Sequence, residues 1–126
     1  MFDPGAHPER VAEYEAMLPD HYDVWAATEL FAPADVDRLT EAWRKAPRPP
    51  TAVIEGPAAQ RRRGNLTNSG LALFVSGWSV VGIRRHRFES CGRRRTDADT
   101  WAAKGVLWIA LTHPRGARLD VAATHL

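Results

Sequence analysis

Two stretches of the chain carry apolar residues at the spacing of one helix face, Pro8–Leu18 and Ala34–Ala46. In the second stretch, Val36, Leu39 and Trp43 recur every three or four positions, as the buried side of an amphipathic helix does. A proline lies at or just before the start of each stretch, and further prolines follow its end, where helices stop. The pattern therefore predicts two helices in the N-terminal part of the chain.

Six short stretches alternate between apolar and polar residues or are apolar throughout, which predicts β-strands. They are Tyr22–Phe31, Thr51–Glu55, Leu71–Val75, Ser79–Ile83, Gly105–Leu111 and Leu119–Thr124. Gly105–Leu111 is apolar on both of its faces, so we expect it inside a layered sheet and covered on both sides. Pro114 and Gly116 interrupt the pattern just after it, which predicts a hairpin to the last strand. The arginine-rich stretches 56–68 and 84–103 are predicted to be connections.

The bulk properties predict one folded domain, residues 1–126, that is large enough to bury a core. The apolar runs are too short to cross a membrane, so we expect no transmembrane segment. The N-terminus lacks a basic segment followed by an apolar one, which predicts no signal peptide and, by default, a cytoplasmic location. The single cysteine, Cys91, excludes an internal disulfide.

Charge is distributed unevenly along the chain. Residues 1–60 hold 5 basic and 11 acidic side chains, a balance of −6, whereas residues 61–126 hold 12 basic and 4 acidic ones, a balance of +8. Most of the basic side chains are arginines, whose guanidinium groups suit phosphate oxygens. The basic half is either a solvated surface that faces the acidic half or a surface that binds phosphate or nucleic acid.

Four polar residues lie where predicted strands begin or end: Glu29, Asn68, Lys104 and His125. Glu29 closes an apolar strand, either because the strand reaches solvent there or because its carboxylate binds a hard metal ion or acts as an acid. Asn68 opens an Asn-Ser-Gly sequence that is typical of turns. Lys104 and His125 occupy strand ends, where polar side chains are ordinary. Residue types alone leave these alternatives open.

Together, however, these residues form a recognisable pattern. Lys104-Gly105 opens a strand, a turn with glycine follows, and the return strand ends in Thr124-His125-Leu126. With the stretch Asn68–Leu73 and the spacing Phe88…Cys91-Gly92…Lys104-Gly105, this pattern resembles the endonuclease/exonuclease/phosphatase superfamily, and more closely its sphingomyelinase-like phosphodiesterases. The resemblance extends over roughly residues 8–126.

The resemblance implies an α/β fold, a partial four-layer α/β/β/α sandwich. We expect this chain to supply mainly one mixed or antiparallel sheet with two N-terminal helices. It also implies Mg²⁺-dependent hydrolysis of a phosphodiester, with a phospholipid such as sphingomyelin as the leading substrate class and nucleic acid as the alternative. Glu29 matches the family's Mg²⁺ ligand, although Thr28 stands where the family usually has glutamine. His125 matches a catalytic histidine, and Asn68 and Lys104 would bind the substrate phosphate.

Other family motifs have no match in these 126 residues: the asparagine that ends the first strand, a later Asp-x-Asn pair and a final Asp-His pair. We therefore expect an N- and C-terminally truncated member with weak or no activity alone. One alternative is half of a split phosphodiesterase that a second polypeptide completes. Another is a non-catalytic module that binds phosphate or nucleic acid through its arginine-rich half.

Overall fold

The computed structural model describes residues 8–17, 22–59, 67–89 and 102–125. In chain order, the elements are α1 (Pro8–Met17), β1 (Val24–Ala27), α2 (Pro33–Arg44), β2 (Ala52–Glu55), β3 (Ala72–Val75), β4 (Ser79–Arg87), β5 (Gly105–Thr112) and β6 (Arg118–Thr124). Each predicted helix and strand has a counterpart. The largest differences in length are in β1, which is shorter than predicted, and β4, which runs four residues further to Arg87.

The strands form two antiparallel sheets of three strands each, with the orders β1-β3-β2 and β4-β5-β6. The expectation of mainly one sheet was therefore wrong. Periodicity shows where strands lie but does not show which strands pair, because pairing depends on contacts between distant parts of the chain. The mixed α/β class, with two N-terminal helices, is confirmed.

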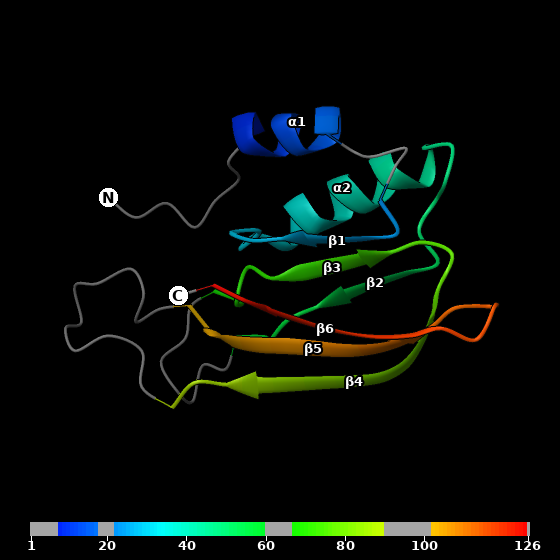
Figure 1. The fold of residues 1–126 in the computed structure, drawn as a ribbon. Helices are drawn as coiled ribbons and strands as arrows, with labels where there is room; N and C mark the ends of the chain where they lie inside the picture. The colour runs from blue at the N-terminus through cyan, green and yellow to red at the C-terminus, as the bar shows by residue number, and fades with distance from the viewer. Residues whose placement is uncertain (1–7, 18–21, 60–66, 90–101, 126) are drawn as a thin grey trace.

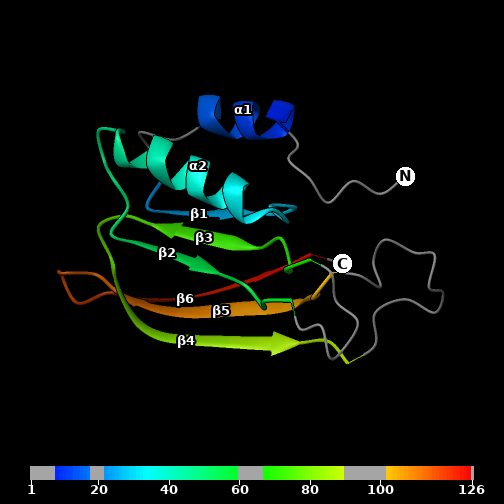
Figure 2. The ribbon, with the colours of Figure 1, turned by 180° about the vertical axis from the view of Figure 1, so that it is seen from behind.

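Two cores hold three layers together (Figure 1). The first lies between the helices and the β1-β3-β2 sheet, where Trp43 stacks on Phe74 with a ring distance of 4.9 Å. The second lies between the two sheets, where Leu73 and Val75 of β3 face Leu107 of β5. Seen from behind, the same order of helices, first sheet and second sheet is evident (Figure 2). The second sheet thus supplies the partner layer that a single sheet would have lacked.

Only one face of β5 is fully covered by the described residues. Leu107, Ile109 and Leu111 on its inner face are 0–1% exposed, whereas Val106 and Trp108 on its outer face are half-buried. Arg84 of β4 covers part of Trp108, with its guanidinium carbon 5.4 Å from the ring centre. In the part of the chain that the structure describes, no helix lies on this outer face (Figure 1). The described layers are therefore α/β/β, and the fourth layer is not among them.

Candidate active site

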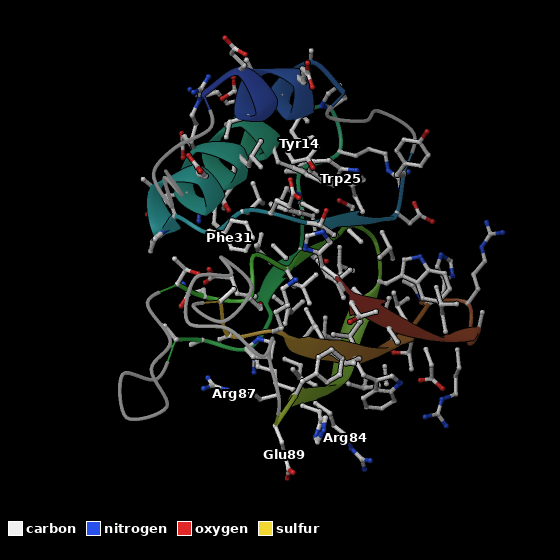
Figure 3. All side chains as sticks on the ribbon, turned by 90° about the vertical axis from the view of Figure 1, so that its left-hand side faces the viewer. Tyr14, Trp25, Phe31, Arg84, Arg87 and Glu89 are labelled. Carbon is white, nitrogen blue, oxygen red and sulfur yellow. The ribbon has the colours of Figure 1, made fainter. Side chains whose placement is uncertain are left out.

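All four candidate residues lie at one end of the two sheets. Glu29 and His125 follow β1 and β6, which end there, whereas Asn68 and Lys104 precede β3 and β5, which begin there. Two contacts join the segments that precede β3 and β5. One is an isolated parallel bridge between Thr67 and Ala102, and the other is a hydrogen bond of 3.0 Å from the Ala103 amide to the Thr67 carbonyl. Figure 3 looks onto this end of the molecule.

Glu29 and His125 are brought into contact across the two sheets. Oε1 of Glu29 lies 3.6 Å from Nε2 of His125, and the two side chains are 35% and 30% exposed. The opposite ring nitrogen of His125, Nδ1, is buried and has no hydrogen-bond partner among the described residues. The pair therefore presents one carboxylate and one imidazole nitrogen near solvent, although 96 positions separate the residues in the sequence.

The backbone of Glu29 is unusual. Its φ angle is +62°, and no other non-glycine residue in the described ranges has a positive φ. A left-handed backbone disfavours residues with a Cβ, so the surrounding structure must hold it. The next residue, Leu30, donates its amide to the Gly70 carbonyl at 2.9 Å. This hydrogen bond ties the turn after β1 to the segment that leads into β3.

His125 is held through the residue before it. Oγ1 of Thr124 donates to the Gly105 carbonyl at 2.9 Å, at the point where β6 ends beside the beginning of β5. Gly105 itself allows a close approach, because a Cβ at this position would lie within 3.0 Å of the Arg87 Cα on the neighbouring strand. The hairpin of β5 and β6 thus fixes where His125 leaves the sheet.

Asn68 lies beside the turn that holds Glu29. Its Oδ1 accepts the Ala59 amide at 2.8 Å, which orients the side chain and leaves its NH₂ group to act as a donor. The side chain lines a cavity of about 70 Å³ together with Leu30, Glu55 and Gly70. Lys104 is half-buried, and its carbonyl accepts the Phe88 amide at 3.0 Å. Lys104 and Asn68 thus share the end of the sheets with the Glu29–His125 pair.

The arginines of β4 make contacts within the protein. Nε of Arg85 donates to the Glu55 carbonyl at 2.7 Å, and Arg87 donates to the Ala58 carbonyl, so both tie the edge of the second sheet to β2 and the segment after it. Arg84 lies on the outer face (Figure 3). The remaining arginine clusters, 61–63 and 93–95, lie outside the described residues, as do Cys91 and Gly92.

The donor set fits a hard divalent cation that retains several waters. Mg²⁺ commonly binds through one or two carboxylates and keeps water in its other positions, and Glu29 offers one carboxylate that solvent can reach. Among the described residues, no group of three or more His, Cys, Asp or Glu side chains could hold a metal ion. The described residues therefore offer the Glu29 carboxylate as a candidate ligand and no closed cage.

Comparison with known proteins relates this geometry to a solved structure. Neither a family model nor a curated protein matches the sequence. The crystal structure of SmcL, a sphingomyelinase C, matches 92% of this chain with a TM-score of 0.71 and 22% identity. The chain has a sphingomyelinase-like fold. It spans 40% of the SmcL chain. In the described part of this chain, no helix is both long and apolar enough to cross a membrane.

Sequence reasoning missed the residues that shape the turn at Glu29. Gly70 appeared only as part of a turn before a strand, and Phe31 appeared as the last residue of a predicted strand. In the structure, β1 ends at Ala27, and Phe31 lies beyond the turn, against Gly70. A glycine directly before a fully apolar strand was the available signal, because such glycines often mark a close approach of backbone segments.

Proposed function

We propose that this chain is part of a divalent-metal-dependent phosphodiester hydrolase, with Mg²⁺ as the metal ion and a phospholipid as the leading substrate. The observation that carries the proposal is the contact between Glu29 and His125 at one end of a sphingomyelinase-like fold. A carboxylate and an imidazole at this distance are suited to bind a hard cation and to move a proton near the same phosphate.

Each residue has a distinct task in this proposal. Glu29 holds the cation, which when bound polarises water and the phosphate oxygens. His125 exchanges a proton with, or donates a hydrogen bond to, an oxygen of the diester through Nε2. Asn68 donates its NH₂ group to a non-bridging oxygen, and Lys104 supplies positive charge to the diester. The hydrogen bond from the Ala59 amide supports this role of Asn68, because it occupies Oδ1 and leaves the NH₂ group to donate.

Burial favours one tautomer of His125. A buried N–H group without a partner is rarer in proteins than an acceptor without one. Because Nδ1 is buried and unpartnered among the described residues, we infer that its proton is on Nε2, which faces Glu29. In this tautomer, Nε2 is a donor that can hydrogen-bond an oxygen of the phosphate.

The extent of the match favours a chain with little activity by itself. The 40% of SmcL that is matched leaves most of that chain without a counterpart here. Removal of one positioned acid or base typically lowers the rate by about 10²–10⁴-fold.

As a second candidate, we propose that another polypeptide completes the site. The half-buried Trp108 on the outer face favours this arrangement.

Metal binding is the direct test of the site. Mn²⁺, a paramagnetic substitute for Mg²⁺, should bind the purified chain in electron paramagnetic resonance titrations and should be displaced by Mg²⁺. Glu29→Gln should abolish this binding, since the neutral amide is a poor ligand for a hard cation. Glu41→Gln, on the exposed face of α2, is the control and should bind Mn²⁺ normally. Unchanged Mn²⁺ binding by Glu29→Gln would contradict the assignment of Glu29 as the metal ligand.

Hydrolysis is the second test. The chain should cleave bis(4-nitrophenyl) phosphate, and more efficiently sphingomyelin in mixed micelles, at low rates that EDTA abolishes. Glu29→Gln and His125→Gln should each remove this turnover, and Glu41→Gln should keep it. Turnover that survives EDTA and both substitutions would come from a contaminant or another site and would contradict the proposal.

A further inference from the structure

Glu29 needs an unfavourable backbone to reach His125. Its φ of +62° turns the chain sharply just after β1, and its carboxylate then lies 3.6 Å from Nε2 of His125. An L-residue with a Cβ leaves this conformation readily unless its neighbours hold it. The question is therefore which contacts fix the turn.

The Gly70 backbone contacts both the Phe31 ring and the turn at Glu29. Its own φ is +75°, and a Cβ built on it would lie 2.8 and 2.9 Å from two atoms of the Phe31 ring and 3.1 Å from the Glu29 Cα. Real Cβ atoms essentially never come as close as the first two distances, so the ring and the turn pack directly on the glycine backbone. The Gly70 carbonyl also accepts the Leu30 amide, directly after Glu29.

We propose that Gly70, with the Phe31 ring seated on it, is a positioning residue that sets the place of the Glu29 carboxylate. Gly70 touches neither metal nor substrate in this assignment. It acts through the Glu29 backbone, by leaving room for the turn and by bonding the amide that follows it. The consequence for metal binding rests on the proposed function, whereas the consequence for the Glu29–His125 geometry does not.

A matched pair of glycine substitutions distinguishes an effect on the position of Glu29 from an effect on the stability of the fold. Gly77 lies beyond the opposite end of β3 and has the same φ of +75°, but a Cβ there would meet only Nη2 of Arg48, at an ordinary van der Waals distance of 3.4 Å. Gly70→Ala and Gly77→Ala therefore carry the same backbone strain, but only the first displaces Glu29. Loss of a group that orients a metal ligand typically costs about 10–100-fold in affinity.

We expect Gly70→Ala to weaken Mn²⁺ binding by about 10–100-fold, as loss of other ligand-orienting groups does, and Gly77→Ala to keep the wild-type affinity. Circular dichroism should show both variants folded. Phe31→Leu, which removes the ring edge over Gly70 but keeps an apolar side chain, should weaken binding in the same direction. Wild-type affinity in a folded Gly70→Ala variant would overturn the proposal. If Gly70→Ala does not fold, wild-type affinity in Phe31→Leu would overturn it.

A metal-free measurement distinguishes failure of this inference from failure of the proposed function. If the wild-type chain binds no Mn²⁺, the metal site is wrong, and the crystal structure of Gly70→Ala then decides the inference. A distance between Oε1 of Glu29 and Nε2 of His125 beyond about 4 Å, the limit of an ion pair, would support positioning by Gly70. Retention of the 3.6 Å contact would overturn it.

Discussion

Glu29 has a strained backbone and a side chain that faces a histidine from the other sheet. Strain of this kind persists only where the surrounding structure holds the residue, and it is common at functional sites. Glycine adopts φ of +62° without the penalty of a Cβ. The position therefore allows a test of whether stability and metal binding oppose each other at one residue.

We predict that Glu29→Gly stabilises the fold by about 0.5–1 kcal/mol, since relief of about 1–2 kcal/mol of left-handed strain exceeds the entropic cost of glycine. The same variant should lose Mn²⁺ binding. Urea unfolding and Mn²⁺ titration check the two effects. Glu55→Gly, at the end of β2 where φ is not positive, is the control and should destabilise the fold by about 0.5–1 kcal/mol. Destabilisation by Glu29→Gly would show that the turn is not strained.

Asp23 joins three segments at the opposite end of the sheets. Its Oδ2 accepts the Trp78 indole N–H at 3.2 Å, its Oδ1 accepts Arg48 at 2.5 Å, and its carbonyl accepts the Ser76 amide. The hydrogen bond from Trp78, followed by that from Arg48, lowers the pKa of the Asp23 carboxyl below its ordinary value of 3.8. The ionised form is thus the one that the fold favours.

This pKa shift predicts a pH dependence with a definite sign. The stabilisation is fully present above pH 3.8 and is lost as the pH falls through the lowered pKa of folded Asp23. Asp23→Asn should therefore cost about 0.5–1 kcal/mol at neutral pH, as expected for a half-exposed pair, and progressively less in acid. Urea unfolding from pH 7 downward measures this, with Asp120→Asn on the exposed strand β6 as the control. A cost that does not change with pH would contradict the assignment.

At single positions, the sequence predicted where polar residues lie better than it predicted the conformation of their backbone. Glu29 and His125 were expected at strand ends on residue type and family resemblance, and the structure brings them into contact. The left-handed turn at Glu29 was not predicted, because φ at one residue depends on what lies against it. Here that is Gly70 and Phe31, and Gly70 lies some forty positions further along the chain.

Strand β5 shows how far a hydrophobic pattern determines an element. Its inner face, Leu107, Ile109 and Leu111, forms the centre of the core between the sheets. Ile109→Ala should destabilise the fold by about 2–5 kcal/mol, because a buried aliphatic side chain is lost and a cavity remains. Urea unfolding checks this, with Val81→Ala as the control. Val81 is 57% exposed, so its truncation should cost less than about 0.5 kcal/mol. Equal costs would mean that the sheets do not pack as described.

Strand β4 shows where such a pattern fails. It was expected to end at Ile83, because Arg84, Arg85 and Arg87 looked like a basic connection. The structure continues the strand to Arg87, since at this edge of the sheet the inner-facing arginines bond carbonyls across to β2 and the segment after it. A long side chain can cross between layers with its charged end satisfied, so charge in the sequence does not always mark a loop.

The first sheet lies between the helices and the second sheet, and its central strand, β3, is buried on both faces. This arrangement determines how the chain should unfold. Ala72 and Phe74 face the helices, Leu73 and Val75 face the second sheet, and all four residues are 0–1% exposed. Separation of either layer would expose one side of β3 to water. The layers should therefore lose their structure together, as one cooperative unit.

We accordingly predict that far-ultraviolet circular dichroism, which reports helices and strands, and near-ultraviolet circular dichroism, which reports the packing of the five tryptophans, show the same thermal midpoint. Trp43 and Trp25 contact Phe74 of β3, so part of the near-ultraviolet signal reports the helix–sheet core. Phe74→Leu should lower both midpoints equally, because it weakens the strand that the two cores share. A near-ultraviolet transition that precedes the far-ultraviolet one would instead mean that the helices detach while the sheets remain paired, and that β3 does not couple the two cores.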